Sequence, residues 1–131
     1  MYKSYKKLKV WEKAHELVKD IYAIDFHFES FEKYGLESQL KSAVVSVAAN
    51  IVEGASRQYN KEFRRFLFIA KGSLGEVNYY LLLCYELKYL SKEDFFRLDD
   101  KCDHIGRMLS SLISKINKDL QEIKTNQRVD E

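Results

Sequence analysis

The residues best suited to do chemistry in this sequence of 131 residues are basic ones near its middle. They recur at spacings close to three, four and seven, so they would line one edge of a helix. The five positions are Arg57, Lys61, Arg64, Arg65 and Lys71. Basic groups along such an edge can contact successive phosphates, which predicts salt-dependent binding of nucleic acid with little sequence preference. The plainer alternative is a solvated helix face.

Charge is distributed unevenly along the chain, although the formal net charge is only +2. Residues 57–72 carry five Lys or Arg and one acid, whereas residues 21–56 carry two basic groups and five acids. A local basic patch is therefore compatible with the nearly balanced total. Four lysines near the N-terminus would enlarge such a patch if they folded beside it: Lys3, Lys6, Lys7 and Lys9.

A metal site is the next kind of chemistry to consider. Glu12 and His15 form a Glu-x-x-His pair, the spacing that di-iron helical bundles use for metal ligands. Such a site needs a second pair and two further carboxylates, and neither His27 nor His104 has a glutamate three residues before it. We therefore expect His15 to be a solvated or partly buried side chain.

Other catalytic or cofactor-binding arrangements are equally unsupported. Cys84 and Cys102 have no ligand partner close in sequence, and they are typical of buried thiols in a reducing cytosol. The segment Gly72-Ser73-Leu74-Gly75 is neither a nucleophile elbow nor a phosphate-binding loop. We predict no catalytic residue, no cofactor and no metal, and hence a protein that is not an enzyme.

Two polar residues flank the apolar stripe of a predicted helix that ends near residue 54. Asn50 and Glu53 should be partly buried there, and a buried carboxylate needs a partner. The structural interpretation is that they bond the start of the next helix or an arginine such as Arg57 or Arg64. Contact with a ligand or partner is the alternative.

The elements that position these residues are long helices. The sequence has no proline and only five glycines, and apolar residues recur every three or four positions. This predicts one all-α domain over residues 1–131, an antiparallel up-down-up-down four-helix bundle with polar tails at both ends. The helices are predicted at about 8–27, 36–54, 61–89 and 92–120. Phe26, Phe28 and Phe31 follow the first helix and should close one end of the core.

Helix boundaries are predicted from capping residues. Gly54 should end the second helix in a left-handed conformation, which glycine adopts readily. Asn60 should cap the N-terminus of the third helix with its side chain. Ser91 and Asp94 form an approximate capping box at the start of the fourth helix.

Small residues inside the third helix need an explanation, because each glycine disfavours a helix by up to about 1 kcal/mol relative to alanine. Gly72, Ser73 and Gly75 predict a place where another backbone comes close. Ala48 and Ala49 on the second helix are plausible opposite partners.

A surplus of apolar residues predicts self-association. Eleven of the fourteen positions in residues 77–90 are apolar or aromatic, more than one core-facing stripe requires. Tyr79, Tyr80, Leu83 and Leu87 should point away from the core, and apolar patches of that size are rare on monomers. We expect these four residues to form an interface between subunits.

No apolar run reaches the roughly 18 residues of a membrane span, and the basic N-terminal segment has no long apolar run after it. We expect no signal peptide, no membrane partner and a soluble, cytoplasmic protein.

Four pieces of the chain resemble a family of four-helix bundles, the proteins encoded within intervening sequences of bacterial 23S rRNA. The pieces are VWEKAHELV (10–18), YGLESQLKSAVVSVAANIVEG (34–54), KEFRRFLFIAKGSLGEV (61–77) and LSKEDF (90–95). Their order and spacing agree with the family over roughly residues 8–118. Ala48 stands where the family usually has a proline.

The resemblance implies an antiparallel bundle that assembles as a ring, typically a homopentamer. It is similar in this to the accessory variability protein of diversity-generating retroelements, whose basic ring binds nucleic acid and a reverse transcriptase. We therefore expect a non-enzymatic homo-oligomer that binds RNA or DNA, RNA before DNA, through its basic edge. A scaffold that binds a reverse transcriptase or another protein, without contacting nucleic acid, is the alternative.

Overall fold

The computed structural model describes residues 5–130, and the side chains of residues 5–128. Lys3 of the predicted basic patch lies outside the described residues. The long helices are α1 (Lys9–Ala23), α2 (Leu36–Ala55), α3 (Asn60–Glu86) and α4 (Lys92–Asp130). Two short 3-10 helices, η1 (Tyr5–Lys7) and η2 (Ser30–Tyr34), precede α1 and α2.

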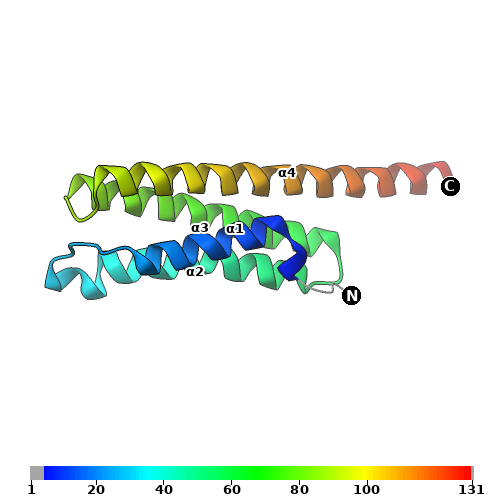
Figure 1. The fold of residues 1–131 in the computed structure, drawn as a ribbon. Helices are drawn as coiled ribbons and strands as arrows, with labels where there is room; N and C mark the ends of the chain where they lie inside the picture. Colours follow the sequence, from blue (N-terminus) through cyan, green and yellow to red (C-terminus); the bar gives the residue numbers. More distant parts are fainter. Residues whose placement is uncertain (1–4, 131) are drawn as a thin grey trace.

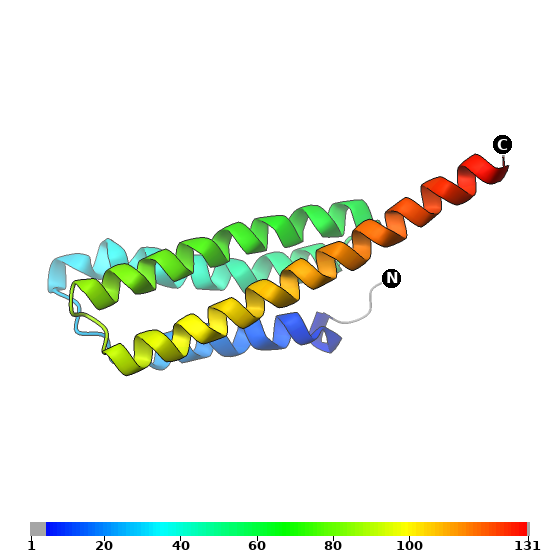
Figure 2. The ribbon, with the colours of Figure 1, turned by 90° about the horizontal axis from the view of Figure 1, so that it is seen from above.

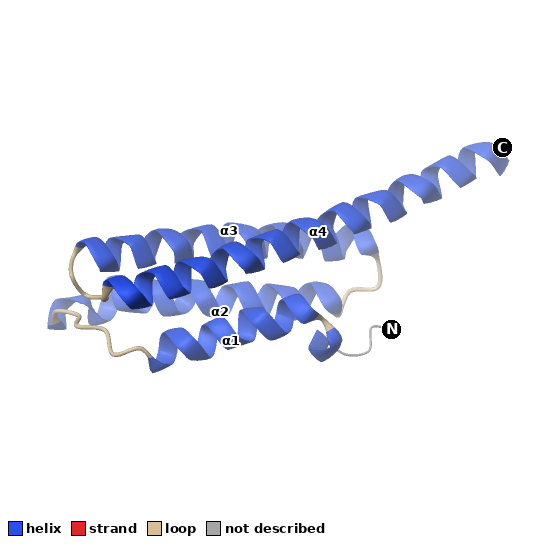
Figure 3. Ribbon diagram, turned by 45° about the horizontal axis from the view of Figure 1, so that its top comes forward, coloured by secondary structure: helices blue, strands red, loops and turns tan. Residues whose placement is uncertain are grey.

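Consecutive long helices run in opposite directions and lie side by side (Figure 1, Figure 3). The α1–α2 and α3–α4 connections lie at one end of the bundle, and the α2–α3 connection lies at the other. The described residues contain no strand. The prediction of an all-α four-helix bundle is confirmed. None of the helices in residues 5–130 is both long and apolar enough to cross a membrane.

One continuous core joins the four helices. Each helix contributes at least one leucine with no exposed surface: Leu17, Leu40, Leu67 and Leu98. Burying a leucine side chain is worth about 1.5–3 kcal/mol, so these contacts outweigh the weaker local preferences of the chain. The inward stripes are those that the three-to-four periodicity predicts.

The first helix ends four residues earlier than predicted, because the chain leaves it to close the core. Phe26 and Phe28 stack with ring centroids 4.9 Å apart, and Phe28 also contacts Tyr89 at 5.3 Å. The backbone N–H of His27 donates to the carbonyl of Tyr89 (2.9 Å). Phe31, which was also expected in this plug, is instead 73% exposed.

The fourth helix continues to Asp130 instead of ending near residue 120. No glycine or proline follows Gly106 in the sequence, so no residue interrupts the backbone hydrogen bonds. Its last turns project beyond the α2–α3 corner (Figure 2). The predicted polar tail is therefore largely an exposed helical extension.

Gly54 has a different role from the predicted left-handed cap. α2 runs through it to Ala55, and Lys88 (φ 67°) is the only described residue with a positive φ. A Cβ atom on Gly54 would lie 2.8 Å from Cβ of Phe66 and 2.9 Å from Cδ1 of Phe63. Glycine is needed here because the start of α3 packs directly against the α2 backbone.

The two predicted side-chain caps differ in outcome. Asn60 is the first residue of α3 rather than its cap; Tyr59 holds the cap position and makes no side-chain cap bond. Ser91 caps α4 as predicted, since its Oγ accepts from the N–H of Asp94 (3.1 Å).

The glycines of α3 do not mark an approach between helices of the same chain. A Cβ on Gly72 or on Gly75 would have no neighbour within 4 Å among the described residues, so both glycines face open space there. The close contact between α2 and α3 in this region is made by Ser46 and Ser73, whose hydroxyls lie 2.9 Å apart. The prediction that Ala48 and Ala49 pack against these glycines is wrong.

An ion-pair cluster ties α1 to α4 at the opposite end from the α2–α3 corner. Asp20 contacts the guanidinium of Arg97 (3.2 Å) and the ammonium of Lys101. Partial burial by itself would raise the pKa of Asp20, but hydrogen bonds and charge attraction from Lys101 and Arg97 outweigh it, so the pKa is lowered overall.

We predict that Gly54→Ala destabilises the fold by about 1–3 kcal/mol, because the added methyl group would overlap two phenylalanines of α3. Gly106→Ala is the matched control: its Cβ would lie 3.6 Å from Cδ2 of Leu74, an ordinary contact. That variant should gain up to about 1 kcal/mol of helix propensity. Urea unfolding measures the free energy of unfolding of both variants. Equal effects of the two substitutions would contradict the role of Gly54 in close helix packing.

We predict that Asp20→Asn lowers the free energy of unfolding at pH 7 by about 1 kcal/mol, the upper range for exposed ion pairs. Because the folded pKa of Asp20 lies below the unfolded value, its contribution is present above about pH 4 and is lost as the pH falls through the folded pKa. The difference in free energy of unfolding between wild type and variant should therefore be smaller at pH 3 than at pH 7.

Candidate nucleic-acid interface

The basic residues predicted to bind phosphate lie at the α2–α3 corner and along the first half of α3. Arg57 already has two partners within the protein. Its guanidinium donates to Oε1 of Glu53 (2.5 Å) and lies 4.9 Å from the ring centroid of Phe66. The guanidinium of Arg65 stacks on the same ring at 4.5 Å. One phenylalanine thus holds two guanidinium groups close together at this corner.

The other three basic residues of this set differ in their surroundings. Arg64 reaches across to α4, where it donates to Oδ1 of Asn117 (2.6 Å). Lys61 and Lys71 are exposed, and no described carboxylate lies within ion-pairing distance of either. Arg64 and Lys71 therefore lie toward α4, whereas Arg57 and Arg65 meet at Phe66, and the ammonium groups of the two lysines are left without an ion-pair partner among the described residues.

The two polar residues beside this edge are engaged within the bundle. Asn50 donates from Nδ2 to the carbonyl of Ser46 (2.8 Å) and to its Oγ (3.0 Å). Glu53 pairs with Arg57, as the structural interpretation expected, but its side chain is 51% exposed and not partly buried as predicted. Ser46 in turn contacts Ser73, so the amide group extends a polar chain between α2 and α3.

Charge is segregated along the whole bundle. The midline is marked by the Ser46–Ser73 contact and by the approach of Leu74 to Gly106. The half that includes the α2–α3 corner comprises residues 5–15, 46–72 and 107–128, with fourteen Lys or Arg and five acids. The other half, residues 16–45 and 73–106, has seven basic groups and thirteen acids. The protein thus has one basic half and one acidic half.

Much of the basic half comes from residues that sequence reasoning missed, above all on α4. Lys115, Lys118, Lys124 and Arg128 lie on the second half of that helix or on its extension. Counting the charges in each half of every predicted helix would have found these residues. The count becomes informative only when the antiparallel order of the helices places the basic half-helices at the same end of the bundle.

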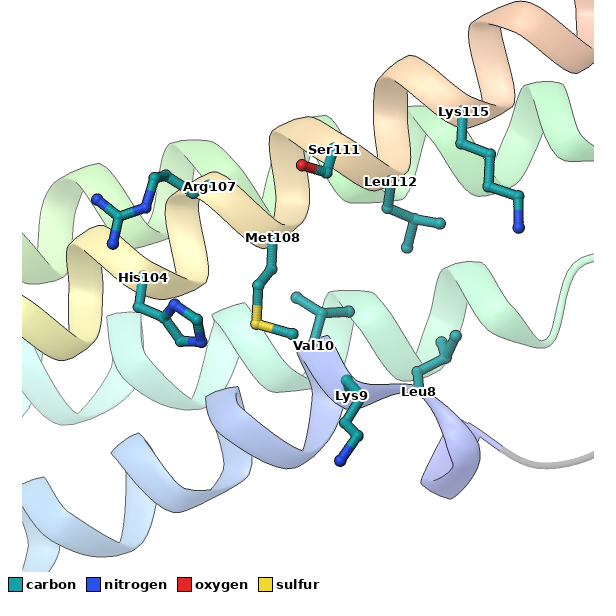
Figure 4. Close-up of a pocket in the computed structure, with 9 residues that line it drawn as sticks. All are labelled: Leu8, Lys9, Val10, His104, Arg107, Met108, Ser111, Leu112 and Lys115. Carbon is teal, nitrogen blue, oxygen red and sulfur yellow. The ribbon is translucent and has the colours of Figure 1, made fainter.

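A groove between α1 and α4 opens in the basic half, as Figure 4 shows. Val10, Met108 and Leu112 form its apolar floor, and Arg107 and Lys115 lie on its rim. The cavity is about 450 Å³, and none of the described residues that line it is acidic. Its shape and charge suit an anionic group with an apolar part.

The four residues predicted to form a subunit interface are only partly exposed. Tyr80 and Leu83 pack against the core, and the Tyr80 hydroxyl donates to Oε1 of Gln39 (2.9 Å). Tyr79 and Leu87 are 57% and 46% exposed. The surface that remains open on α3 therefore differs in part from the predicted one.

The candidate metal ligands are not brought together. His15 stacks on Trp11, with ring centroids 4.8 Å apart. Within the described residues there is no group of three or more His, Cys, Asp or Glu side chains that could hold a metal ion. Burial raises the pKa of both Cys84 and Cys102 to about 12, so neither is a thiolate at neutral pH.

A sequence model of the 23S rRNA-intervening sequence proteins matches residues 6–111. The chain belongs to this family. The match covers α1, α2, α3 and α4 as far as Ser111, so it includes the acidic half and most of the basic half, while the core residues Ile113 and Ile116 lie beyond it. Residues 112–130, which contain the α4 extension, lie beyond the matched range.

A solved structure supports the family fold. A protein of unknown function of the S23 ribosomal protein family, from Bacteroides thetaiotaomicron VPI-5482, is 25% identical with a TM-score of 0.73. The alignment covers 79% of this chain and 97% of that chain. No curated protein sequence matches the chain.

Proposed function

We propose that this member of the 23S rRNA-intervening sequence family is a non-enzymatic, homo-oligomeric protein that binds nucleic acid, RNA in preference to DNA. The observation that carries the proposal is the segregation of charge, which places fourteen basic groups in one half of a small bundle. A protein whose total charge is only +2 gains affinity for phosphate only if its cations are collected in this way.

Arg57, Lys61, Arg64, Arg65 and Lys71 supply one edge of the phosphate-binding surface, and Lys115 and Lys118 of α4 extend it. Because such contacts carry no sequence information, binding depends on the spacing of phosphates rather than on base identity. The family description names an rRNA sequence, which favours RNA as the first ligand to test.

Self-association belongs to the same proposal. The exposed apolar residues of α3 favour it, and the pentameric ring that the family resemblance implies is its finer form. Repeating a weak phosphate-binding surface in an oligomer raises its total affinity without any new type of contact.

A protein-binding scaffold is the second candidate. The groove of Figure 4 favours it, because an acidic amphipathic helix of a partner would match its apolar floor and basic rim. In that case the cations would form ion pairs with the partner's carboxylates, and the protein would not bind structured RNA.

We predict that structured RNA binds the protein with steep salt dependence, losing about a thousandfold in affinity between 50 and 200 mM salt if six phosphates are engaged. The double variant Arg64→Ala/Lys115→Ala should lower the slope of log affinity against log salt by about 0.7–0.9 for each phosphate that is no longer neutralised. Filter binding or fluorescence anisotropy at several salt concentrations measures the slope.

The matched control is Lys33→Ala/Lys92→Ala, which removes the same charge from exposed positions of the acidic half. It should leave the slope unchanged. Equal decreases in slope for both double variants would mean that net charge alone matters, and the proposed surface would then be wrong.

We predict that sedimentation at micromolar concentration gives a multiple of the 15.5 kDa chain mass, five times that mass for a single ring and ten times for two joined rings. The physical reason is the apolar surface that α3 leaves uncovered. A 15.5 kDa monomer would contradict the self-association part of the proposal and leave the RNA-binding part standing.

A further inference from the structure

The outward face of α3 carries a regular stripe of exposed positions between the side that faces α2 and the side that faces α4. These positions alternate in spacing between four and three, the heptad pattern of helices that pair with another helix. The eight positions are Lys61, Arg65, Phe68, Gly72, Gly75, Tyr79, Leu82 and Glu86, and all eight are exposed. Neither Phe68 (53% exposed) nor Tyr79 (57%) belongs to the core.

The centre of the stripe is unusually open. Gly72 and Gly75 face space in which an added Cβ would meet no atom within 4 Å. Glycine is unfavourable inside a helix, and within residues 5–130 no side chain packs into the space that these two leave. A pair of glycines one turn apart lets a second helix backbone come close, and the residues on either side then reach the partner.

We propose that this stripe pairs with the same stripe of a second copy, antiparallel, about a two-fold axis that passes between Ser73 and Leu74. A two-fold contact is self-complementary, so each position meets the one equally far on the other side of the axis. Gly72 then lies opposite the partner's Gly75 at the crossing. Phe68 meets the partner's Tyr79, an aromatic pair.

The outer layers of the stripe follow the same rule. Arg65 lies opposite the partner's Leu82, where its aliphatic stem can pack while the guanidinium stays stacked on Phe66. Lys61 lies opposite the partner's Glu86, which makes an ion pair at each end of the seam. The spacing of all eight positions therefore fits one axis, with small residues in the middle, apolar residues around them and opposite charges outside.

The charges of the whole bundle select the antiparallel arrangement. In a parallel pair Lys61 would face Lys61, and the two basic halves would lie side by side. In the antiparallel pair the half with fourteen basic groups lies beside the partner's half with thirteen acids. Like charges are thereby separated along the full length of the contact.

This inference rests on the self-association part of the proposed function and not on nucleic-acid binding. A two-fold contact closes on two chains, so the α3 seam gives free dimers or joins two rings that face in opposite directions, and a ring itself closes through other surfaces of the bundle. In the pair Lys61 and Arg65 belong to the seam, so phosphate contacts come from Arg64 and Lys71 beside it and from the cations of α4, and each pair presents a basic surface at both of its ends.

Cysteine cross-linking without RNA tests the direction of pairing. Phe68→Cys and Tyr79→Cys are made separately, mixed, and oxidised. Cys84 and Cys102 are buried, with pKa values of about 12, and should not react. We expect a cross-linked dimer in the mixture and in neither variant alone, because two copies of position 68 would be about 16 Å apart along an antiparallel seam. Cross-linking of Phe68→Cys with itself, or none in the mixture, would overturn the proposal.

A second test keeps Phe68 and Tyr79 in place, because replacing either with cysteine removes an aromatic contact and weakens association. Gly75→Glu adds a charge at the crossing while improving helix propensity, and the sedimenting mass should fall by half. Ala49→Glu places the same charge on an exposed position of α2 and should leave the mass unchanged. A mass unchanged in Gly75→Glu, or halved in both variants, would count against α3 pairing. Loss of RNA binding with the cross-link pattern intact would count only against the proposed function.

Discussion

The packing of α3 directly on the backbone of α2 at Gly54 is the constraint on which the basic corner depends. Because no side chain separates the two helices there, Phe63 and Phe66 lie across the end of α2. Phe66 in turn supports the guanidinium groups of Arg57 and Arg65. A residue that functions only by being small thus determines where two of the candidate phosphate-binding groups are held.

The antiparallel order of the helices produces the charge segregation. The start of α1, the α2–α3 corner and the second half of α4 are far apart in sequence, and each carries an excess of basic groups. Folding brings them to the same end of the bundle (Figure 1). At the other end, Asp20 shows how the acidic half uses its own cations, since Arg97 and Lys101 are engaged in ion pairs with it. The cations of the basic half outnumber the acids near them, and this surplus is what an external anion can use.

Glycine positions show why sequence reasoning succeeded for some features and not for others. A glycine signals that a side chain is absent, but not which neighbour needs the space. At Gly54 the neighbour is α3 of the same chain, whereas at Gly72 and Gly75 the described part of the chain provides none. Ser91 could be predicted as a cap because its bond to the N–H of Asp94 is local. The end of α1 could not be predicted, because it depends on Phe28 finding Tyr89 far along the chain.

The sequence by itself determined the four helices, their inward faces, the family and the basic cluster at 57–71, because three-to-four periodicity and charge spacing are properties of neighbouring residues. Only the tertiary structure decided that α4 joins this cluster, that Tyr80 and Leu83 turn toward the core, and that the glycines of α3 face outward. The physical reason is that a helix can present its polar face to solvent, to a partner or to another helix with the same local pattern. The choice among these is made by the packing of elements that are distant in sequence.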